Sequence, residues 1–356
     1  MLFLCIDANF RLKNQLVSNY SQDPGLGIGW AYMLPREEYE AYVLSRASDG
    51  NVCITLFHPL YATDRLLFFL KISTCVGLQA LAKMNLKFSR GLRYTGVGGV
   101  MCGRSEMIMP LGIGNLQKGE RCVLGEIFQH ESSLTAICRY ANMDFIIASV
   151  VKAFVIQTLA LLIILLSYDI ACQWFVNLFA RMEKHWPPSL RIPASTKLIP
   201  TIPKLHEPMH GRKNHEGYSL NFIPGVGKSD METPERVWAG HNGLGNSTKT
   251  QGPGGRHDVL DDHFSFWNWL KYVGLGKTLI SRYKVALAEC NRQTEGHRGL
   301  TNSLDPDLVA KWEAICVAWD EDDYPKKCPN PYQKEGVRKC SAVHFSGLLH
   351  AKCALQ

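Results

Sequence analysis

Two strongly apolar runs in this chain each end in an aspartate. The first, LFLCID, reaches Asp7, and the second, ALLIILLSYD, reaches Asp169. A short continuous apolar run predicts a central strand that is covered on both faces. Carboxylates at the ends of buried strands, joined by one from a helix, are a typical arrangement for holding two divalent metal ions in phosphoryl chemistry. The pattern therefore predicts an α/β fold with an acidic site where these strands end.

Short sequence words around these acids occur in order along most of the chain. They are DANFRLKN (7–14), DPGLGIGW (23–30), RGLRYTGVGGVMCGR (90–104), GIGNLQKGER (112–121), YDIACQW (168–174), YSLNFIPGVG (218–227), the long run from PERVWAGHN to FWNWLK (234–271) and NRQTEGHRGL (291–300). Together they resemble transposases of the Kyakuja-Dileera-Zisupton (KDZ) family, which are abundant as mobile elements in mushroom-forming fungi. The resemblance implies an RNase H-like mixed-sheet core, with a helical insertion and a helical C-terminal extension.

The resemblance also implies a DDE-type activity, in which an acidic triad binds Mg²⁺ or Mn²⁺ and the enzyme cuts and joins DNA strands at transposon ends. DNA is then the partner, homo-oligomers are conceivable, and the nucleus is the expected location. Carboxylate oxygens suit these hard cations.

By the resemblance, Asp7 is the first acid of the triad, Asp169 the second and Glu235 the third. Glu232 lies three residues earlier, on nearly the same face of a helix expected over 231–242, and is the second choice. Taken singly, each acid has a simpler explanation, such as capping a turn or pairing with a neighbouring arginine. Three acids in matching words favour metal binding. Asp230 is the expected N-cap of the helix, and Pro234 falls in its first turn.

Three histidines lie within ten residues of one another, at His206, His210 and His215. Residues four apart on a helix can bind zinc, and the KDZ family often has a His/His/Cys-like cluster here, so a structural Zn²⁺ is one interpretation. Pro208 argues against a regular helix between the first two. A polar histidine loop near the active site is an equally good interpretation.

Basic residues in the family words are candidates for DNA contacts, because Lys and Arg side chains hold phosphates. The segment that follows the third acid is rich in Gly, Ser and Thr and predicts a flexible loop. Any one of these residues is equally well explained as part of a solvated face. The candidates are Arg11, Lys13, Arg93, Arg104, Lys249, Arg256 and His257.

Composition alone narrows the class of protein less than the family resemblance does. The chain has 356 residues, of which 46% are hydrophobic, enough for one large domain or two small ones. Its net charge of +7 suits a polyanionic partner without proving one. The 12 cysteines are scattered singly and form no CxxC pair, which favours reduced thiols in the core.

The segment 154–167 is apolar enough to suggest a membrane span. It has roughly 14 residues, whereas a span needs about 20, so the end of a helix followed by a buried strand is expected instead. The opening of the chain is also too short for a secretory signal.

The same reasoning divides the chain into four parts: a first core part over 1–186, a Pro/His-rich insertion over 187–230, the third-acid helix and a helical part over 231–332, and a tail over 333–356. Within the part over 187–230, the Pro-rich stretch 187–204 is interpreted as a linker or an insertion. The stretches 49–71, 122–138 and 333–356 match no family word, which indicates retained introns or a decayed gene model, with plain sequence divergence as the alternative. We expect them to be looped out or poorly packed.

A rival interpretation is a catalytically inactive, truncated transposase remnant. The chain begins directly at the first expected core strand, so it is expected to lack an upstream DNA-targeting module. Such a remnant would bind nucleic acid weakly at most. Convergence of the three acids in the folded chain is the feature that separates the two interpretations.

Overall fold

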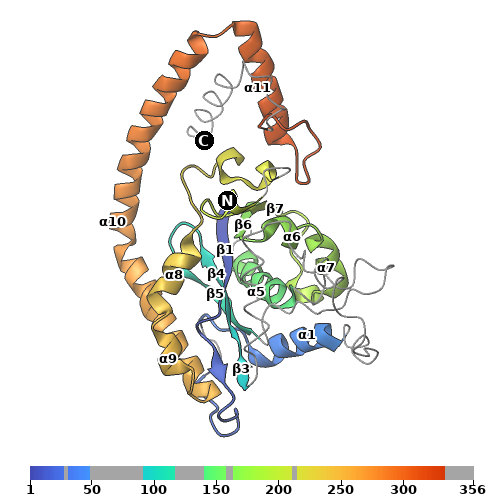
Figure 1. Cartoon of the computed structure of the whole chain (residues 1–356), viewed down its shortest axis with the longest axis vertical. Helices are drawn as coiled ribbons and strands as arrows, with labels where there is room; N and C mark the ends of the chain where they lie inside the picture. Colours follow the sequence, from blue (N-terminus) through green and yellow to red (C-terminus); the bar gives the residue numbers. More distant parts are fainter. Residues whose placement is uncertain (28–30, 49–90, 117–139, 158–162, 211–214, 333–356) are drawn as a thin grey trace, which may run out of the picture.

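A five-stranded mixed sheet forms the centre of the protein (Figure 1). The computed structural model describes residues 1–27, 31–48, 91–116, 140–157, 163–210 and 215–332. The strand order is β5-β4-β1-β6-β7, with β1 parallel to β6 and β6 parallel to β7, whereas β4 is antiparallel to both β1 and β5. The strands are β1 (Leu2–Asn9), β4 (Gly96–Cys102), β5 (Ile108–Leu116), β6 (Ile163–Tyr168) and β7 (Lys197–Thr201). The predicted α/β class is confirmed.

The alternation of side chains along β1 decides where its aspartate points. Leu4 and Ile6 belong to the large core cluster on one face, whereas Phe3 and Cys5 belong to a smaller cluster on the other. Because the side-chain period of a strand is two, Asp7 lies on the face of Phe3 and Cys5. The parallel register pairs Ile6 with Tyr168, so the residues that follow them, Asp7 and Asp169, come at the same level of the sheet.

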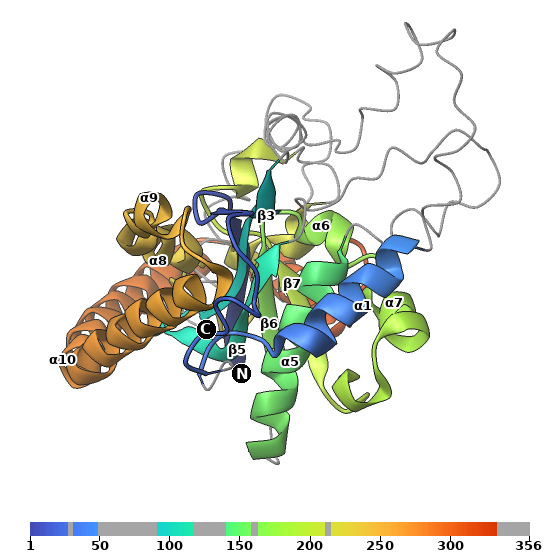
Figure 2. The same cartoon turned by 90° about the horizontal axis from the view of Figure 1, so that it is seen from below.

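Helices cover both faces of the sheet (Figure 2). On one face, α5 (Ala141–Gln157) packs on β4 and β5, with α1 (Arg36–Ser48) beside it. On the other face lie α8 (Thr233–His241) and the first part of α10 (Pro253–Asn302). The first half of α5 is buried on all sides, which explains why its sequence is apolar around the whole helix.

The described residues of the segment that resembled a membrane span, 154–157 and 163–167, belong to a helix and to a strand of the sheet. Helix α5 ends at Gln157 and strand β6 begins at Ile163, in the middle of the sheet, as the sequence predicted. Among the described residues, no helix has the length and apolar character that crossing a membrane requires.

The prediction of a linker over 187–204 is wrong in its second half, because 197–201 forms the edge strand β7. Pro200 concealed this strand from sequence reasoning. A proline cannot donate to a ladder of hydrogen bonds, but it is tolerated in a strand with a free edge. The described part of the sheet thus draws its fifth strand from the region assigned to the insertion, whose remainder contains short 3-10 turns.

The remaining elements include one unusually long helix, α10, which leaves the sheet and is followed by a helix that turns back (Figure 1). Helix α8 begins at Thr233 with Pro234 in its first turn, as predicted. Its N-cap is Glu232 rather than Asp230, whose side chain instead accepts from the Glu232 amide at 3.1 Å. The other elements are β2 (Asn14–Gln15), β3 (Leu92–Tyr94), α6 (Ala171–Trp174), α7 (Leu178–His185), η3 (Pro188–Leu190), η4 (Glu207–Met209), η5 (Glu216–Tyr218), η6 (Leu220–Phe222), α9 (Leu244–Thr248) and α11 (Pro306–Glu321).

The stretches 49–71, 122–138 and 333–356, which match no family word, lie outside the described residues. Their expected loose packing stays a prediction, and so does the division into four parts.

Candidate active site

Carboxylates from strand β6 and helix α8 converge on one histidine. Asp169 directly follows β6, and its Oδ2 lies 3.4 Å from Nε2 of His206. The other ring nitrogen, Nδ1, lies 3.4 Å from Oε2 of Glu232 and 3.9 Å from Oε1 of Glu235. Ligand atoms of Asp169, His206 and Glu235 all lie within 4.8 Å of one another. We call Asp7, Asp169, Glu232 and Glu235, together with His206, the acid cluster.

Asp7 joins this cluster from strand β1 and is held by helix α8. The indole Nε1 of Trp238 donates to its Oδ2 at 2.8 Å. In the antiparallel register Asp7 lies opposite Gly99, where a Cβ atom would come within 2.7 Å of the Trp238 ring. The missing side chain at Gly99 therefore leaves room for the indole beside strand β4, where it reaches the carboxylate.

The acids of the cluster destabilise one another's ionised forms. Burial raises the pKa of Asp7 well above its ordinary value, and the negative charges of Asp169 and Glu235 raise it further. Burial also raises the pKa of Asp169 and brings that of Glu235 to about 7. A cation placed among these groups would relieve the repulsion.

His206 supplies such a charge. Its contact with Glu232 is the main reason why its pKa rises to about 9, despite its partial burial, and Asp169 and Glu235 raise it further. The imidazole is therefore protonated at neutral pH and forms ion pairs within the acid cluster. This role was not foreseen, because the sequence grouped His206 with the other two histidines as a zinc ligand.

The two glutamates of α8 differ in exposure and in partners. The Glu232 side chain is only 5% exposed, and its Oε1 accepts from the Leu205 amide at 2.6 Å. The Glu235 side chain is 42% exposed. Glu232 therefore fixes the loop that carries His206, whereas Glu235 has an accessible carboxylate that can take up a ligand.

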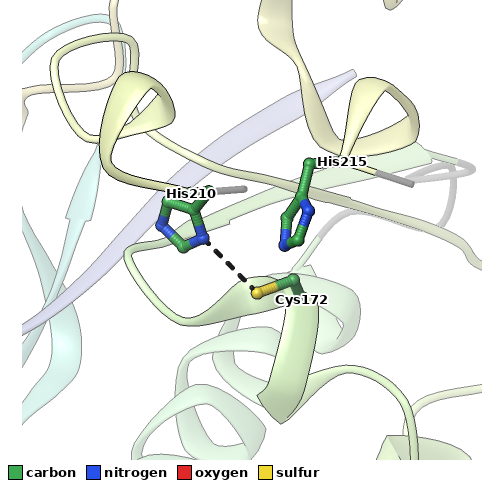
Figure 3. A group of neighbouring side chains, drawn as sticks. All are labelled: Cys172, His210 and His215. Atoms are coloured by element: carbon green, nitrogen blue, oxygen red, sulfur yellow. Dashed lines mark hydrogen bonds between the residues drawn. The ribbon is translucent and has the colours of Figure 1, made fainter. Parts of the chain in front are cut away.

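The remaining two histidines form a separate group with a cysteine (Figure 3). The Sγ atom of Cys172 lies 3.6 Å from Nδ1 of His210, and the rings of His210 and His215 are 5.4 Å apart. Burial lowers the pKa of His210 to about 4, so its ring is neutral at physiological pH. Sequence reasoning missed Cys172 because a lone cysteine after an apolar strand is typical of a buried core thiol. Its only signal was its place three residues after Asp169.

One comparison with known proteins identifies the family of the chain. The family model described as "Kyakuja-Dileera-Zisupton transposase" matches residues 1–268. The chain belongs to this family. Neither the curated proteins nor the solved structures contain a significant match. The matched residues include every member of the acid cluster, so the KDZ assignment covers the site as well as the sheet.

A KDZ transposase binds DNA, and the structure shows where the predicted basic contacts lie. Arg11 is exposed and Lys13 half-buried in the chain that follows β1, at the end of the strand nearest Asp7. Lys249 belongs to the same region, since its carbonyl accepts from the Gln15 amide at 2.8 Å. These three remain available as phosphate contacts.

The other candidates are less suited to the task. Arg104 stacks on Phe3, 4.0 Å from the ring centroid, at the opposite end of β1. The guanidinium of Arg93 donates to the Ser18 carbonyl, and His257 is half-buried. Arg256 is completely buried, so its prediction as a DNA contact in a flexible loop is wrong. The segment that contains it forms α9 and the start of α10.

Proposed function

We propose that this KDZ transposase cuts DNA and transfers strands at transposon ends, with divalent metal ions held by Asp7, Asp169 and Glu235 on an RNase H-like core. The observation that carries the proposal is the convergence of carboxylates from β1, β6 and α8 at one place on the sheet. The order of the strands supports the RNase H-like assignment. On one side of β1 lies the antiparallel strand β4 with β5 next to it, and on the other side lie the parallel strands β6 and β7.

The donor set fits Mg²⁺ or Mn²⁺. The cluster offers carboxylate oxygens, which these hard cations prefer, and burial, together with the charges of neighbouring acids, raises the pKa values of Asp7 and Glu235. Paired metal ions, when bound, would activate the attacking water or 3′-hydroxyl and stabilise the leaving oxygen. The protein's part is to position the ligands, which Trp238 does for Asp7 and Glu232 does for the loop of His206.

Nicking of supercoiled plasmid in Mg²⁺ or Mn²⁺ tests the proposal. We expect the wild-type chain to cut and Asp169→Asn to be inactive, because the amide cannot supply the charge of a bridging carboxylate. Glu207→Gln is the matched control, since it changes an acid next to His206 in sequence that is not part of the acid cluster. Absence of metal-dependent cleavage by folded wild-type protein would contradict the proposal and favour the inactive remnant.

The choice of third acid has its own test. We expect Glu235→Gln to abolish cleavage, because the exposed carboxylate is the one that meets the metal. Glu232→Gln should retain measurable cleavage but weaken metal binding, since it loosens the loop of His206. The opposite ranking in a Mn²⁺ titration would assign the role to Glu232.

Strand cleavage and transfer, as proposed, make transposon ends and target DNA the partners of the protein and the nucleus its place of action.

A further inference from the structure

Helix α10 carries a stripe of apolar and small residues with the spacing of a coiled coil. They recur at alternating intervals of three and four, which is the a/d pattern of two helices that wind around each other. The a positions are Phe266, Val273, Ile280 and Leu287, and the d positions are Trp269, Gly276, Tyr283 and Cys290. We call these eight residues the α10 seam.

The side chains of the α10 seam are open to solvent. Its six large residues are each more than half exposed, and Cys290 is exposed as well. A buried aromatic ring covers about 150–250 Å², so the three aromatic rings, which are 60–69% exposed, still offer roughly 300–450 Å². With the aliphatic side chains between and beside them, including Leu270 and Leu279, the face approaches the area of about 800 Å² that each partner of a stable interface contributes. A soluble monomer rarely exposes so large an apolar patch, which indicates an interface.

The contacts of α10 with the rest of the protein come from the opposite side of the helix. The residues that reach the β4–β5 connection, strand β5 and the chain before α8 are Trp267, Asn268, Lys271, Arg282 and Glu289. At about 100° per residue, this set is centred roughly 150° around the helix axis from the α10 seam. The α10 seam therefore faces away from the sheet, and a second helix can lie along it without displacing any of these contacts.

Charges beside the α10 seam select the orientation of that second helix. Lys277 and Lys284 occupy the e positions. In an antiparallel pair the e positions of the two helices face each other, so the lysines would repel. In a parallel pair each e position faces a g position, and Lys284 would lie beside the apolar Leu279 of the second copy, with its aliphatic stem in contact. Equal charges on the two copies thus favour the parallel pair.

We propose that two copies of this chain associate through the α10 seam as a parallel, in-register coiled coil over residues 266–290. A second copy fits because an a/d stripe is complementary to the same stripe across a twofold axis. All of the α10 seam except Phe266 lies beyond residue 268, where the family match ends. No residue of the acid cluster belongs to the α10 seam, and the proposal does not depend on strand cleavage.

Sedimentation equilibrium of the purified full chain tests the association. We expect the wild type to reach twice the 40.0 kDa mass of one chain, and Ile280→Lys to stay at the mass of one chain because it places two charges in the centre of the pair. Ile280 is exposed in the single chain, so its circular dichroism should stay native. Val285→Lys is the matched control, since this valine is 59% exposed on the same helix at the outward-facing f position, and it should pair like the wild type. A monomeric wild type, or equal behaviour of the two lysine variants, would overturn the proposal.

Cys290 reports the orientation of the pair. In a parallel, in-register coiled coil the two copies of a d residue lie opposite each other, close enough for a disulfide. Mild oxidation with copper phenanthroline should therefore convert the wild type into a covalent dimer on non-reducing gels. Cys290→Ser should sediment as two chains but give no covalent dimer, and Ile280→Lys should lose the crosslink although it keeps Cys290. A wild-type dimer that forms no crosslink through Cys290 would overturn the parallel arrangement.

Discussion

The role of Arg256 is set by its position in the folded chain and not by its neighbours in sequence. Arg256 donates to the Leu12 carbonyl and to Oδ1 of Asn115, each at 2.7 Å. Burial lowers its pKa to about 10, so the buried guanidinium is still charged at neutral pH. It therefore ties the start of α10 to the chain after β1 and to strand β5. Its sequence neighbours, glycines and a histidine, indicated an exposed loop and gave no sign of this burial.

Replacing this arginine should therefore affect stability rather than DNA binding. We expect Arg256→Met to lower the free energy of unfolding by about 2–4 kcal/mol, because one buried and one half-buried acceptor lose their donor. Arg11→Met, which changes an exposed arginine, should stay within about 0.5 kcal/mol of wild type in the same urea titration. Unchanged stability combined with weaker DNA binding in Arg256→Met would restore the original assignment.

The hydrogen bond from Trp238 to Asp7 leads to a second prediction about a single residue. Its indole donates to Asp7 at 2.8 Å, and Phe at this position keeps most of the ring but loses the donor. A hydrogen bond to a charged group contributes about 1.5–3 kcal/mol, so we expect Trp238→Phe to weaken Mn²⁺ binding roughly tenfold with the fold intact. Electron paramagnetic resonance of free Mn²⁺ measures this affinity.

The control for Trp238→Phe is Trp267→Phe. The Trp267 indole donates to the Glu106 carbonyl at 2.7 Å, outside the acid cluster. An equal loss of Mn²⁺ affinity in both variants would mean that Trp238 acts through general packing rather than through Asp7.

At the level of elements, apolar patterning was enough to place the central strands. The runs that end at Asp7 and Asp169 became β1 and β6, and the acids of α8 lie where the helix was expected. The apolar pattern did not predict the structure at a strand that contains a proline and at a loop whose histidines contact different groups. Strand β7 contains a proline, and the loop of His206 and His210 divides its histidines between two groups. Only long-range contacts decide that division, so the sequence could not supply it.

Glu106 links elements that follow one another only distantly in sequence. It lies between β4 and β5, and its carboxylate pairs with Arg236 of α8 and Lys271 of α10, each at 2.7 Å. Burial opposes its ionisation, but the hydrogen bond and charge of Lys271, together with Arg236, outweigh burial and lower the pKa of Glu106 below 4.5. The carboxylate therefore stabilises the fold fully above about pH 4.5, and this contribution is lost as the pH falls through the lower pKa of the folded state.

The stability difference between wild type and Glu106→Gln should follow this rule. We expect about 1 kcal/mol above pH 5, since the cationic partners are partly exposed, and a smaller difference as the pH falls further. Urea titrations at a series of pH values measure it. Glu37→Gln is the control, because the side chain of Glu37 is 87% exposed. A difference that grows toward acid pH would contradict the assignment.

On the scale of the whole molecule, α10 and α11 form an arm that leaves the sheet and returns to it (Figure 1). The chain just after α11 makes the return, through an ion pair of Asp323 with Lys197 of β7, the stacking of Tyr332 on Phe222 and the contacts of Tyr324. The ring centroid of Tyr324 lies 5.1 Å from that of Phe175 and 5.5 Å from that of Tyr218, and the two tyrosine hydroxyls are hydrogen-bonded. Along the arm, Lys228 pairs with Glu289 at 2.8 Å, but both side chains are partly exposed and such pairs contribute little.

We therefore expect Tyr324 to hold the far end of the arm against the core. Tyr324→Ala should cost about 1.5 kcal/mol of local stability, because it removes a half-buried ring, and limited trypsin digestion should then cut the arm roughly tenfold faster. The circular dichroism of the chain should stay native, since the sheet has its own core clusters.

Tyr272→Ala changes a tyrosine on α10 that is 66% exposed and should leave the rate of digestion unchanged. If both variants are cut at the wild-type rate, the arm is anchored elsewhere, and if Tyr324→Ala unfolds throughout, the arm is part of the cooperative core. The expected result, faster cutting of the arm beside an intact core, would show that the arm can detach without disturbing the acid cluster, whose members lie on β1, β6, α8 and the chain after β7.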